Sequence, residues 1–256
     1  MDRLEWIFFG LKYLTVGGSE SGARSFRTSL DEYTVNFLAG KDQPGILCEV
    51  TSSATLPPAL ALKPDQEAAL RDLGFADPGE NPHFTRQVDA ADEATLREMA
   101  ATTIKVLREI YGCEGNCPLE LSFYLETGRL ARTLQYLVVS FLTEFLAEHG
   151  PENLLLVESG RIYAQFTPRG SNDSLYCEVV SNKYLPPDLQ LSSEKIDLLT
   201  SRGFNTPAEE GGNFQKVYPA GDSKAILEIA KDVLGTFQEA YGLASMPKFK
   251  LTLTID

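Results

Sequence analysis

The sequence predicts an α+β protein made of two tandem repeats, each a mostly antiparallel five-stranded sheet covered by helices on one face. Three observations lead to this prediction. The chain has 256 residues, which exceeds the usual single-domain size of about 100–200 residues. Its second half repeats motifs of the first at a nearly constant spacing. Within each half, short strand patterns and apolar helical patterns follow one another in the same order.

The repeat is carried by short motifs that recur in the same order. The segment Leu47–Val50 returns as Tyr176–Val179, and the offset between the two cysteines is 177 − 48 = 129. One residue is inserted after Pro207, so the offset becomes 214 − 84 = 130 from Phe214 onward. The further matches are Leu56-Pro57-Pro58 with Leu185-Pro186-Pro187, Gly74-Phe75 with Gly203-Phe204, Pro78 with Pro207, Phe84 with Phe214, Asp92 with Asp222, and Tyr111-Gly112 with Tyr241-Gly242. Chance matches would scatter the offsets, so we interpret the halves as two copies of one unit.

The first part of each unit reads as a helix followed by three strands. The expected segments of the two copies are the helices Asp2–Tyr13 and Arg129–His149, the hairpins Ser25–Leu30 with Tyr33–Leu38 and Asn153–Val157 with Arg161–Thr167, and the third strands Gly45–Ser52 and Leu175–Asn182. Polar residues mark the hairpin turns, at Leu30-Asp31-Glu32 and at Glu158-Ser159-Gly160. Strands joined by tight turns predict antiparallel pairing.

The second part of each unit adds two helices and two strands. A short helix follows the Leu-Pro-Pro bend, started by Pro64 in one copy and capped by Ser192 in the other. Gly74 and Gly203 are expected to end it in the left-handed conformation. The fourth strands are His83–Val88 and Asn213–Tyr218, and the closing strands are Leu119–Leu125 and Phe249–Ile255.

A long helix between these strands is the clearest element of each copy. Asp92 and Asp222 are expected N-caps, and Gly112 and Gly242 are expected to stop the helices. The apolar stripes have helical spacing and comprise Leu96, Met99, Thr103, Leu107 and Ile110 in the first copy and Ile226, Ile229, Val233, Phe237 and Ala240 in the second.

The domain boundary is expected in the short connection Glu126-Thr127-Gly128. This divides the chain into a first unit, residues 1–127, and a second unit, residues 128–256. Because the linker is so short, we expect the units to form a pseudo-twofold arrangement, like a dimer fused into one chain.

The element order and a run of motifs resemble a known family. The run comprises Tyr176-Cys177-Glu178-Val179-Val180-Ser181-Asn182, Leu185-Pro186-Pro187, Gly203-Phe204 and Asn213-Phe214. It resembles the YbjN-like domains, which are grouped with the type III secretion chaperones as peptide-binding chaperones (TY-Chap). The resemblance covers both units and implies a protein or peptide client and no reaction. The tandem arrangement departs from secretion chaperones, which are usually one domain that homodimerises, so both a monomer with internal pseudo-twofold symmetry and a homodimer stay open.

Charge and composition favour a cytoplasmic protein with no nucleic-acid or membrane partner. The formal net charge of −13 argues against nucleic acid, whose phosphates require a concentrated basic face. The most apolar stretch, residues 130–147, contains Arg132 and Glu144 and reads as a buried helix instead of a membrane span. No secretory signal is recognisable at the start of the chain, and four cysteines in so long a chain suggest no disulfide framework.

No catalytic residue, metal ligand set or cofactor is predicted. The two histidines, His83 and His149, lie before a strand and at a helix end, where structural roles account for them. The glycine-rich segment 17–22 follows a helix instead of opening one, so it lacks the setting of a phosphate loop. Cys113 and Cys117 have a spacing that allows both thiols to bind one metal ion, but the sequence offers no second pair of ligands. Free thiols, a disulfide and a metal site all stay open for these two cysteines.

Two segments are predicted to bind the client. Asn182-Lys183-Tyr184 replaces Ser53-Ala54-Thr55 beside the shared bend, which adds an aromatic and a cation to the second unit only. The helix 129–149 carries more apolar surface than one sheet face requires, and this surplus either packs between the two units or forms a groove for the client. The predicted binding residues are Lys183, Tyr184, Leu185, Pro186, Leu134, Leu137 and Phe141.

The resulting expectation is a non-catalytic chaperone or adaptor. It would bind a client by strand addition at a sheet edge or in a groove between helix and sheet. Two other functions stay open, namely a small-molecule sensor or enzyme with a pocket between the units, and a structural subunit of a larger assembly.

Overall fold

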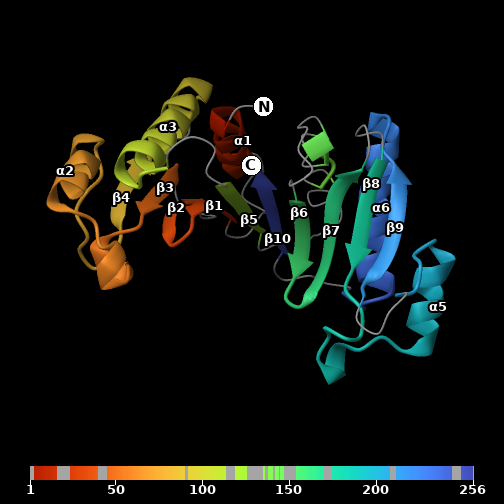
Figure 1. Ribbon diagram of the computed structural model, residues 1–256. Helices are drawn as coiled ribbons and strands as arrows, with labels where there is room; N and C mark the ends of the chain where they lie inside the picture. The colour runs from red at the N-terminus through yellow and green to blue at the C-terminus, as the bar shows by residue number, and fades with distance from the viewer. Residues whose placement is uncertain are drawn as a thin grey trace. The chain divides into compact units, whose positions relative to one another are not determined.

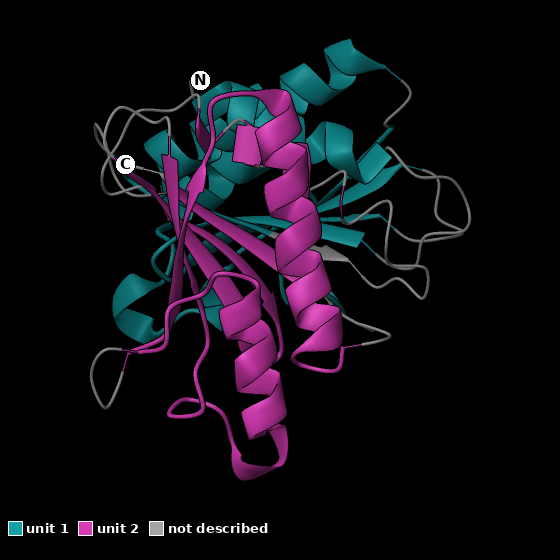
Figure 2. Ribbon diagram, turned by 90° about the vertical axis from the view of Figure 1, so that its right-hand side faces the viewer, with its two compact units in different colours: residues 1–126, 256 teal, residues 127–255 magenta. Residues whose placement is uncertain are grey.

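The computed structural model describes thirteen segments of the chain: residues 3–15, 24–39, 45–89, 92–113, 119–125, 135, 138–140, 142–143, 145–146, 154–169, 174–207, 212–243 and 249–255. The chain divides into two compact units, one formed by residues 1–126 with residue 256 and the other by residues 127–255. Figure 2 colours these units separately.

Unit 1 consists of an antiparallel five-stranded sheet and, among its described residues, three α-helices. Its elements are α1 (Arg3–Thr15), β1 (Arg24–Leu30), β2 (Tyr33–Ala39), β3 (Ile46–Val50), α2 (Pro64–Asp72), β4 (Phe84–Val88), α3 (Glu93–Lys105) and β5 (Leu119–Leu125). The strands lie in the order β4-β3-β2-β1-β5 (Figure 1).

Unit 2 repeats this architecture. Its elements are β6 (Leu154–Ser159), β7 (Ile162–Arg169), β8 (Ser174–Val179), α5 (Ser193–Ser201), β9 (Phe214–Pro219), α6 (Ser223–Glu239) and β10 (Phe249–Ile255). The strands lie in the order β10-β6-β7-β8-β9, all antiparallel. The described residues between 135 and 146 are helical, in agreement with the helix predicted there. Figure 2 shows α5 and α6 along the same face of these strands.

The strand registers confirm the predicted repeat. Phe37 pairs with Cys48 in unit 1, and their equivalents Phe166 and Cys177 pair in unit 2. Cys48 also pairs with Arg86, as Cys177 does with Lys216. Because a one-residue slip would turn every side chain to the other face, equal registers mean that equivalent residues face the same way in both units.

The core of each unit lies between the inner sheet face and the helices. Its largest fully buried side chains are Trp6, Phe26, Phe37 and Phe84 in unit 1, and Phe145, Phe166, Phe204 and Phe237 in unit 2. Every residue of both predicted helix stripes is buried. Asp92 and Asp222 cap the long helices as predicted, by accepting from the backbone N–H of Thr95 and Ala225.

Helix α1 packs unusually closely on the sheet at Gly10. A Cβ atom added to Gly10 would stand 2.7 Å from the ring of Phe26, below any normal contact distance. Phe26 is fully buried and stacks on Phe37 at a centroid distance of 5.4 Å. Glycine, which has no Cβ atom, therefore allows helix α1 to pack this closely against the buried and closely packed ring of Phe26.

The hairpin turn of unit 2 is shorter than the sequence predicted. In unit 2 strand β6 continues to Ser159, and Gly160-Arg161 alone forms the turn, so the turn predicted at Glu158-Ser159-Gly160 is wrong by one residue. Gly160 has a φ of 63°, and Asp31 at the matching position of unit 1 has a φ of 50°. Left-handed residues suit two-residue hairpin turns because their twist matches that of the strands.

A π-helical turn and several short 3-10 turns were not predicted from the sequence. The long helix of unit 1 finishes in a π-helical turn, η3 (Val106–Ile110), where a continuous α-helix was expected. Short 3-10 turns follow the third strands, namely η1 (Ser53–Thr55), η2 (Pro58–Leu60) and η4 (Pro187–Leu189). Gly74 and Gly203 end the short helices with φ values of 83° and 87°, as predicted.

Within the part of the chain that is described, no helix combines the length and the apolar character needed to cross a membrane.

Candidate functional site

The Leu-Pro-Pro bend has the same internal structure in both units. Leu56 and Leu185 are buried beneath it, and Leu185 is only 4% exposed. In unit 2 the side chain of Asn182 bridges the loop, accepting from the N–H of Leu191 at 2.6 Å and donating to its carbonyl at 2.9 Å. In unit 1 the Ser53 hydroxyl accepts from the N–H of Leu62 at 3.1 Å. Asn182 and Ser53, the first residues of the segments that differ between the copies, therefore stabilise the loop by hydrogen bonds to its backbone and do not form a contact surface.

A tyrosine fixes each bend to the end of the long helix. The hydroxyl of Tyr111 donates to the carbonyl of Thr51 at 3.1 Å, and the hydroxyl of Tyr241 donates to that of Val180 at 2.5 Å. Burial raises the pKa of both phenols well above the usual value, so they remain donors. These bonds give the tyrosine that both copies keep at the end of this helix a structural role.

The predicted binding residues of the bend divide into exposed and buried ones. Tyr184 is 50% exposed, as expected, and Lys183 is exposed with its ammonium 5.6 Å from the Tyr184 ring centroid. Pro186 is half-buried. Leu185, by contrast, belongs to the core, so the prediction that it contacts a client is corrected. A buried leucine at this position anchors the bend.

The helical binding residues Leu134, Leu137 and Phe141 lie outside the described residues. Of the same predicted stripe, Val138, Leu142 and Phe145 are fully buried. The described part of this helix therefore faces a core.

The outer face of the unit 2 sheet carries a polar network around Glu178. Its carboxylate accepts from Tyr176 Oη at 2.6 Å and from Gln165 Nε2 at 2.9 Å. The side-chain amides of Asn213 and Gln215 also donate to it, at 3.3 Å and 3.4 Å. Burial, together with the hydrogen bond to Glu178, raises the pKa of Tyr176 to about 12. The network therefore holds the Tyr176 ring in one orientation on this face.

Strand β9 is the terminal strand of unit 2 and is only partly covered. Asn205 forms one bridge to it: its N–H donates to the carbonyl of Gln215 at 2.7 Å and its carbonyl accepts from Gln215 N–H at 3.2 Å. Gln215 therefore directs its backbone groups away from β8. Along an antiparallel strand this direction repeats every second residue, so the N–H and C=O of Val217 also point to the open side. The Val217 side chain is 46% exposed.

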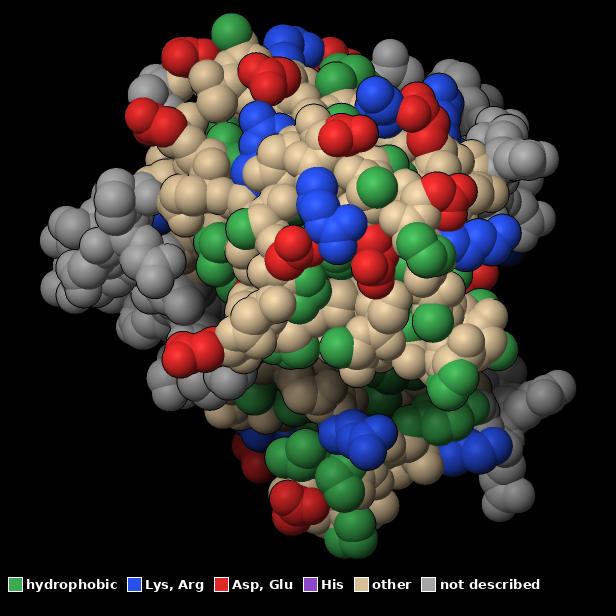
Figure 3. Space-filling model, turned by 90° about the vertical axis from the view of Figure 1, so that its left-hand side faces the viewer, with side chains coloured by type: hydrophobic (Ala, Val, Ile, Leu, Met, Phe, Trp, Pro, Cys, Tyr) green, Lys and Arg blue, Asp and Glu red, His purple; other side chains and the backbone are tan. Residues whose placement is uncertain are grey.

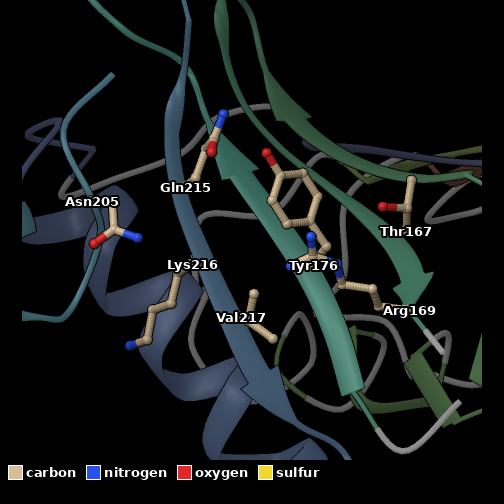
Figure 4. A pocket seen from close by; sticks show the side chains of 7 residues that line it. All are labelled: Thr167, Arg169, Tyr176, Asn205, Gln215, Lys216 and Val217. Atoms are coloured by element: carbon tan, nitrogen blue, oxygen red, sulfur yellow. The ribbon is translucent and has the colours of Figure 1, made fainter. Parts of the chain in front are cut away.

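A hollow of about 310 Å³ lies beside this open edge on the outer face (Figure 4). Residues of three strands and of the Asn205 bridge line it, namely Thr167, Arg169, Tyr176, Asn205, Gln215, Lys216 and Val217. Thr167, Tyr176 and Val217 form one row across β7, β8 and β9, because Thr167 pairs with Tyr176 and Tyr176 with Val217. Arg169 lies over this row, with its guanidinium 5.5 Å from the Tyr176 ring centroid.

The equivalent positions of unit 1 do not reproduce this lining. Tyr176 is replaced by Leu47, Val217 by Gln87 and Arg169 by Gly40. The backbone bridge is kept, because Ala76 pairs with Thr85 as Asn205 pairs with Gln215. The fold is therefore common to both copies, whereas the chemistry of this edge belongs to unit 2.

The opposite face of β9 carries a second polar cluster, which is half-buried against the helices. Asp232 of α6 binds Lys216 Nζ at 2.6 Å, the Arg202 guanidinium at 2.9 Å and the Tyr218 hydroxyl at 2.7 Å. Burial alone would raise the pKa of Asp232, but the hydrogen bonds from Lys216 and Tyr218 and the neighbouring cations outweigh it and lower the pKa. This cluster ties β9 to α6 and commits the Lys216 charge.

The described cysteines and histidine have structural surroundings. Cys48 and Cys177 are free and fully buried in the strands, and burial raises the pKa of both thiols well above the usual value. Cys113 is disulfide-bonded, while Cys117 lies outside the described residues. The backbone N–H of His83 donates to the Asn81 side chain at 3.0 Å, and His149 lies outside the described residues. No group of three or more potential metal ligands occurs among the side chains that the structure describes.

Val217, Tyr176 and Arg169 are not among the binding residues predicted from the sequence. One signal was available, since Phe214 and Tyr218 alternate on the inner face and so turn Val217 outward. Comparison with Gln87 then shows that an apolar side chain replaces a polar one at an outward position.

One family model matches the chain twice. A family model described as "TY-Chap3: T3SS (YopN, CesT) and YbjN peptide-binding chaperone 3" matches residues 13–123 and again residues 128–251. No curated protein matches the chain significantly.

Proposed function

Because the chain belongs to the TY-Chap3 family of T3SS and YbjN peptide-binding chaperones, we propose that it binds extended client segments without catalysing a reaction on them. The tandem family match and the identical strand registers support two peptide-binding folds in one chain. We expect the client to be a protein that exposes an unstructured segment.

The proposed mode of binding is addition of a client strand to the open edge of β9. The observation that carries it is Val217, an exposed apolar residue whose backbone N–H and C=O point away from the sheet. An added strand would satisfy both backbone groups and cover the valine side chain. Main-chain hydrogen bonds of this kind give affinity, and pockets for alternate side chains give specificity.

The edge is short, which limits what it pairs with. Asn205 already occupies the position beside Gln215, and Pro219 has no N–H to donate. Short edges that end in proline are a usual protection against indiscriminate strand pairing. A client would therefore gain few main-chain bonds here and would need side-chain contacts for selectivity.

The surface at Tyr184 is a second proposed contact. Tyrosine buries a large area at small entropic cost and keeps a polar tip. Lys183 beside it adds a cation, and both lie next to a bend whose position is fixed by the Tyr241 bond. Leu185 is left out of this surface because it is buried.

The test measures binding of the full chain to an array of unstructured decapeptides by fluorescence anisotropy. Each binding peptide is remade with single N-methyl groups, which remove one backbone donor at a time. If a strand is added, methylation should abolish binding only at the few alternate positions whose N–H faces β9, and leave the other positions nearly unaffected. In hydrogen exchange, Val217 N–H should be the fast-exchanging amide of β9 and should slow when peptide binds.

Two substitutions locate the site. Val217→Gln, which introduces the residue of unit 1, should weaken binding severalfold without lowering the unfolding midpoint, whereas Gln87→Ala in unit 1 should change neither. Tyr184→Ala should weaken binding with unchanged stability, and Thr55→Ala at the equivalent position should be neutral. Binding that tolerates N-methylation at every position would contradict strand addition, and early melting of Tyr184→Ala with normal binding would make Tyr184 a structural residue.

A further inference from the structure

The hollow beside β9 is positively charged in a strongly acidic protein. Among the described residues that line it, Arg169 and Lys216 are charged and none is an aspartate or glutamate. The whole chain has a net charge of −13. Lys216 is already committed, since its ammonium binds Asp232 at 2.6 Å. Arg169 is therefore the cation that the hollow offers to a ligand.

Arg169 is held in place without being neutralised. Its guanidinium lies over the Tyr176 ring, and the Tyr176 hydroxyl is fixed by Glu178 at 2.6 Å. Arginine stacks on aromatic faces through cation–π attraction and keeps its donors free at the edge. The Arg169 side chain is exposed and makes no ion pair with any described residue.

Two arginines of unit 1, by comparison, have acidic partners. In unit 1, Arg71 binds Asp77 at 2.7 Å and Arg86 binds Glu98 at 3.2 Å. Figure 3 shows acidic and basic side chains interspersed over one face of the molecule. Arg169 differs from these two because its guanidinium stacks on Tyr176 and makes no ion pair with any described residue, and it lies at a concave site next to an open strand edge.

The register places a client side chain toward this hollow. A strand added to β9 puts one residue beside Val217, in the row that already contains Thr167 and Tyr176. Residues that pair across a sheet share a face, so the client side chain would lie on the outer face with the hollow. Neighbouring strands are about 4.8 Å apart, so only a long side chain of the client would extend back over Val217 toward Arg169.

We propose that the hollow receives a glutamate side chain of the client segment and that Arg169 binds its carboxylate. The Thr167 hydroxyl and the Asn205 side-chain amide line the same hollow as further donors. This inference rests on the proposed strand addition at β9 and defines its selectivity. Unit 1, with Leu47, Gln87 and Gly40 at the equivalent positions, lacks both the cation and its aromatic support.

The experiment compares matched peptides on the full-length protein. Decapeptides of alternating valine and threonine, amidated at the C-terminus, carry either one glutamate or one glutamine at the position that faces the hollow. The wild-type protein should bind the glutamate peptide about tenfold more tightly at low salt, and the preference should shrink as salt screens the pair. A third peptide without glutamate but with a free C-terminal carboxylate separates the two sources of a carboxylate.

Substitutions assign the preference to Arg169. Arg169→Gln should remove the tenfold preference but keep the alternating sensitivity to N-methylation, and Arg169→Lys should keep part of the preference. The matched control is Arg27→Gln, which removes a cation from the sheet of unit 1 that is bonded to Asn36 at 2.6 Å. This control should bind like the wild type.

The outcomes separate this inference from the proposed function. Equal binding of the glutamate and glutamine peptides, with N-methylation still acting at alternate positions, would overturn the glutamate site and leave strand addition standing. A preference for the free C-terminal carboxylate alone, or a preference that survives Arg169→Gln, would also overturn it. Loss of the N-methylation pattern would overturn strand addition itself.

Discussion

At the level of single residues, unit 2 uses one acidic side chain to organise the inner side of its edge strand. Asp232 accepts bonds from a lysine, an arginine and a tyrosine that come from β9 and from the end of α5. In unit 1 the equivalent of Lys216 is Arg86, which binds the carbonyl of Leu73 at 3.0 Å and Glu98. Each copy thus satisfies an inward cation on its edge strand, but with different partners.

Removing the Asp232 charge should destabilise the protein in a pH-dependent way. Asp232→Asn leaves two cations without their shared partner, and we expect a loss of about 2–3 kcal/mol at neutral pH, below the roughly 3–5 kcal/mol of a fully buried pair. The folded pKa of Asp232 is lowered below its ordinary value of 3.8. The stabilisation is therefore complete above the unfolded pKa and is lost as pH falls through the folded one.

Urea unfolding at pH 7 and near pH 3 measures this difference. The gap between wild type and Asp232→Asn should shrink at the lower pH, because the wild-type carboxylate begins to bind a proton there. Asp188→Asn, at an exposed position, is the control and should unfold like the wild type at both pH values. A gap that is unchanged or wider near pH 3 would contradict the lowered pKa.

At the level of elements, the long helices combine an N-cap, an apolar stripe and a terminal tyrosine. The cap fixes where the helix begins, the stripe fixes which face meets the sheet, and the tyrosine bonds the far end to the bend. All three features occur in both copies and agree in direction, which is the condition for one well-defined packing.

The stripe gives a direct stability prediction. Phe237 is fully buried, and its ring meets that of Tyr241 edge-on at a centroid distance of 6.2 Å. Phe237→Ala should therefore lower the free energy of unfolding by about 3–5 kcal/mol, the usual range for truncating a buried aromatic. Gln238→Ala, at the exposed neighbouring position, is the control on the same helix and should unfold nearly like the wild type. A urea midpoint shift that amounts to less than about 1 kcal/mol for Phe237→Ala would show that this side of the helix does not carry the packing.

At the level of the whole molecule, the chain contains two copies of a fold whose relatives are described as peptide-binding chaperones. We propose that it behaves as a fused equivalent of a homodimer, because one chain already supplies two such units. The copies have the same registers but different edge chemistry, so a division of labour is expected, with client binding in unit 2.

Sedimentation equilibrium tests the fused-dimer proposal. The expected mass is that of one chain, 28.2 kDa, over a wide concentration range. Val217→Gln should not change it. A mass near twice this value, or one that rises with concentration, would mean that the units still require a second chain.

Most of the fold was predictable from the amino-acid sequence. Repeated motifs at offsets of 129 and 130 predicted the two units, and local signals predicted most element limits. Asp92 and Asp222 mark helix starts, Gly74 and Gly203 mark helix ends, and these act through neighbouring backbone groups only. Local interactions of this kind are legible in sequence because the partners are a few residues apart.

Which surfaces are open, and what charge they carry, became known only from the three-dimensional packing. Leu185 stands in a promising motif, yet it packs into the core, while Val217 stands in a strand that looks ordinary and is exposed. That β9 is a terminal strand, that Lys216 turns inward to Asp232 and that Arg169 stacks on Tyr176 depend on partners from separate strands and helices. Such contacts are set by packing over the whole unit, because the same local sequence could present either face until its neighbours are in place.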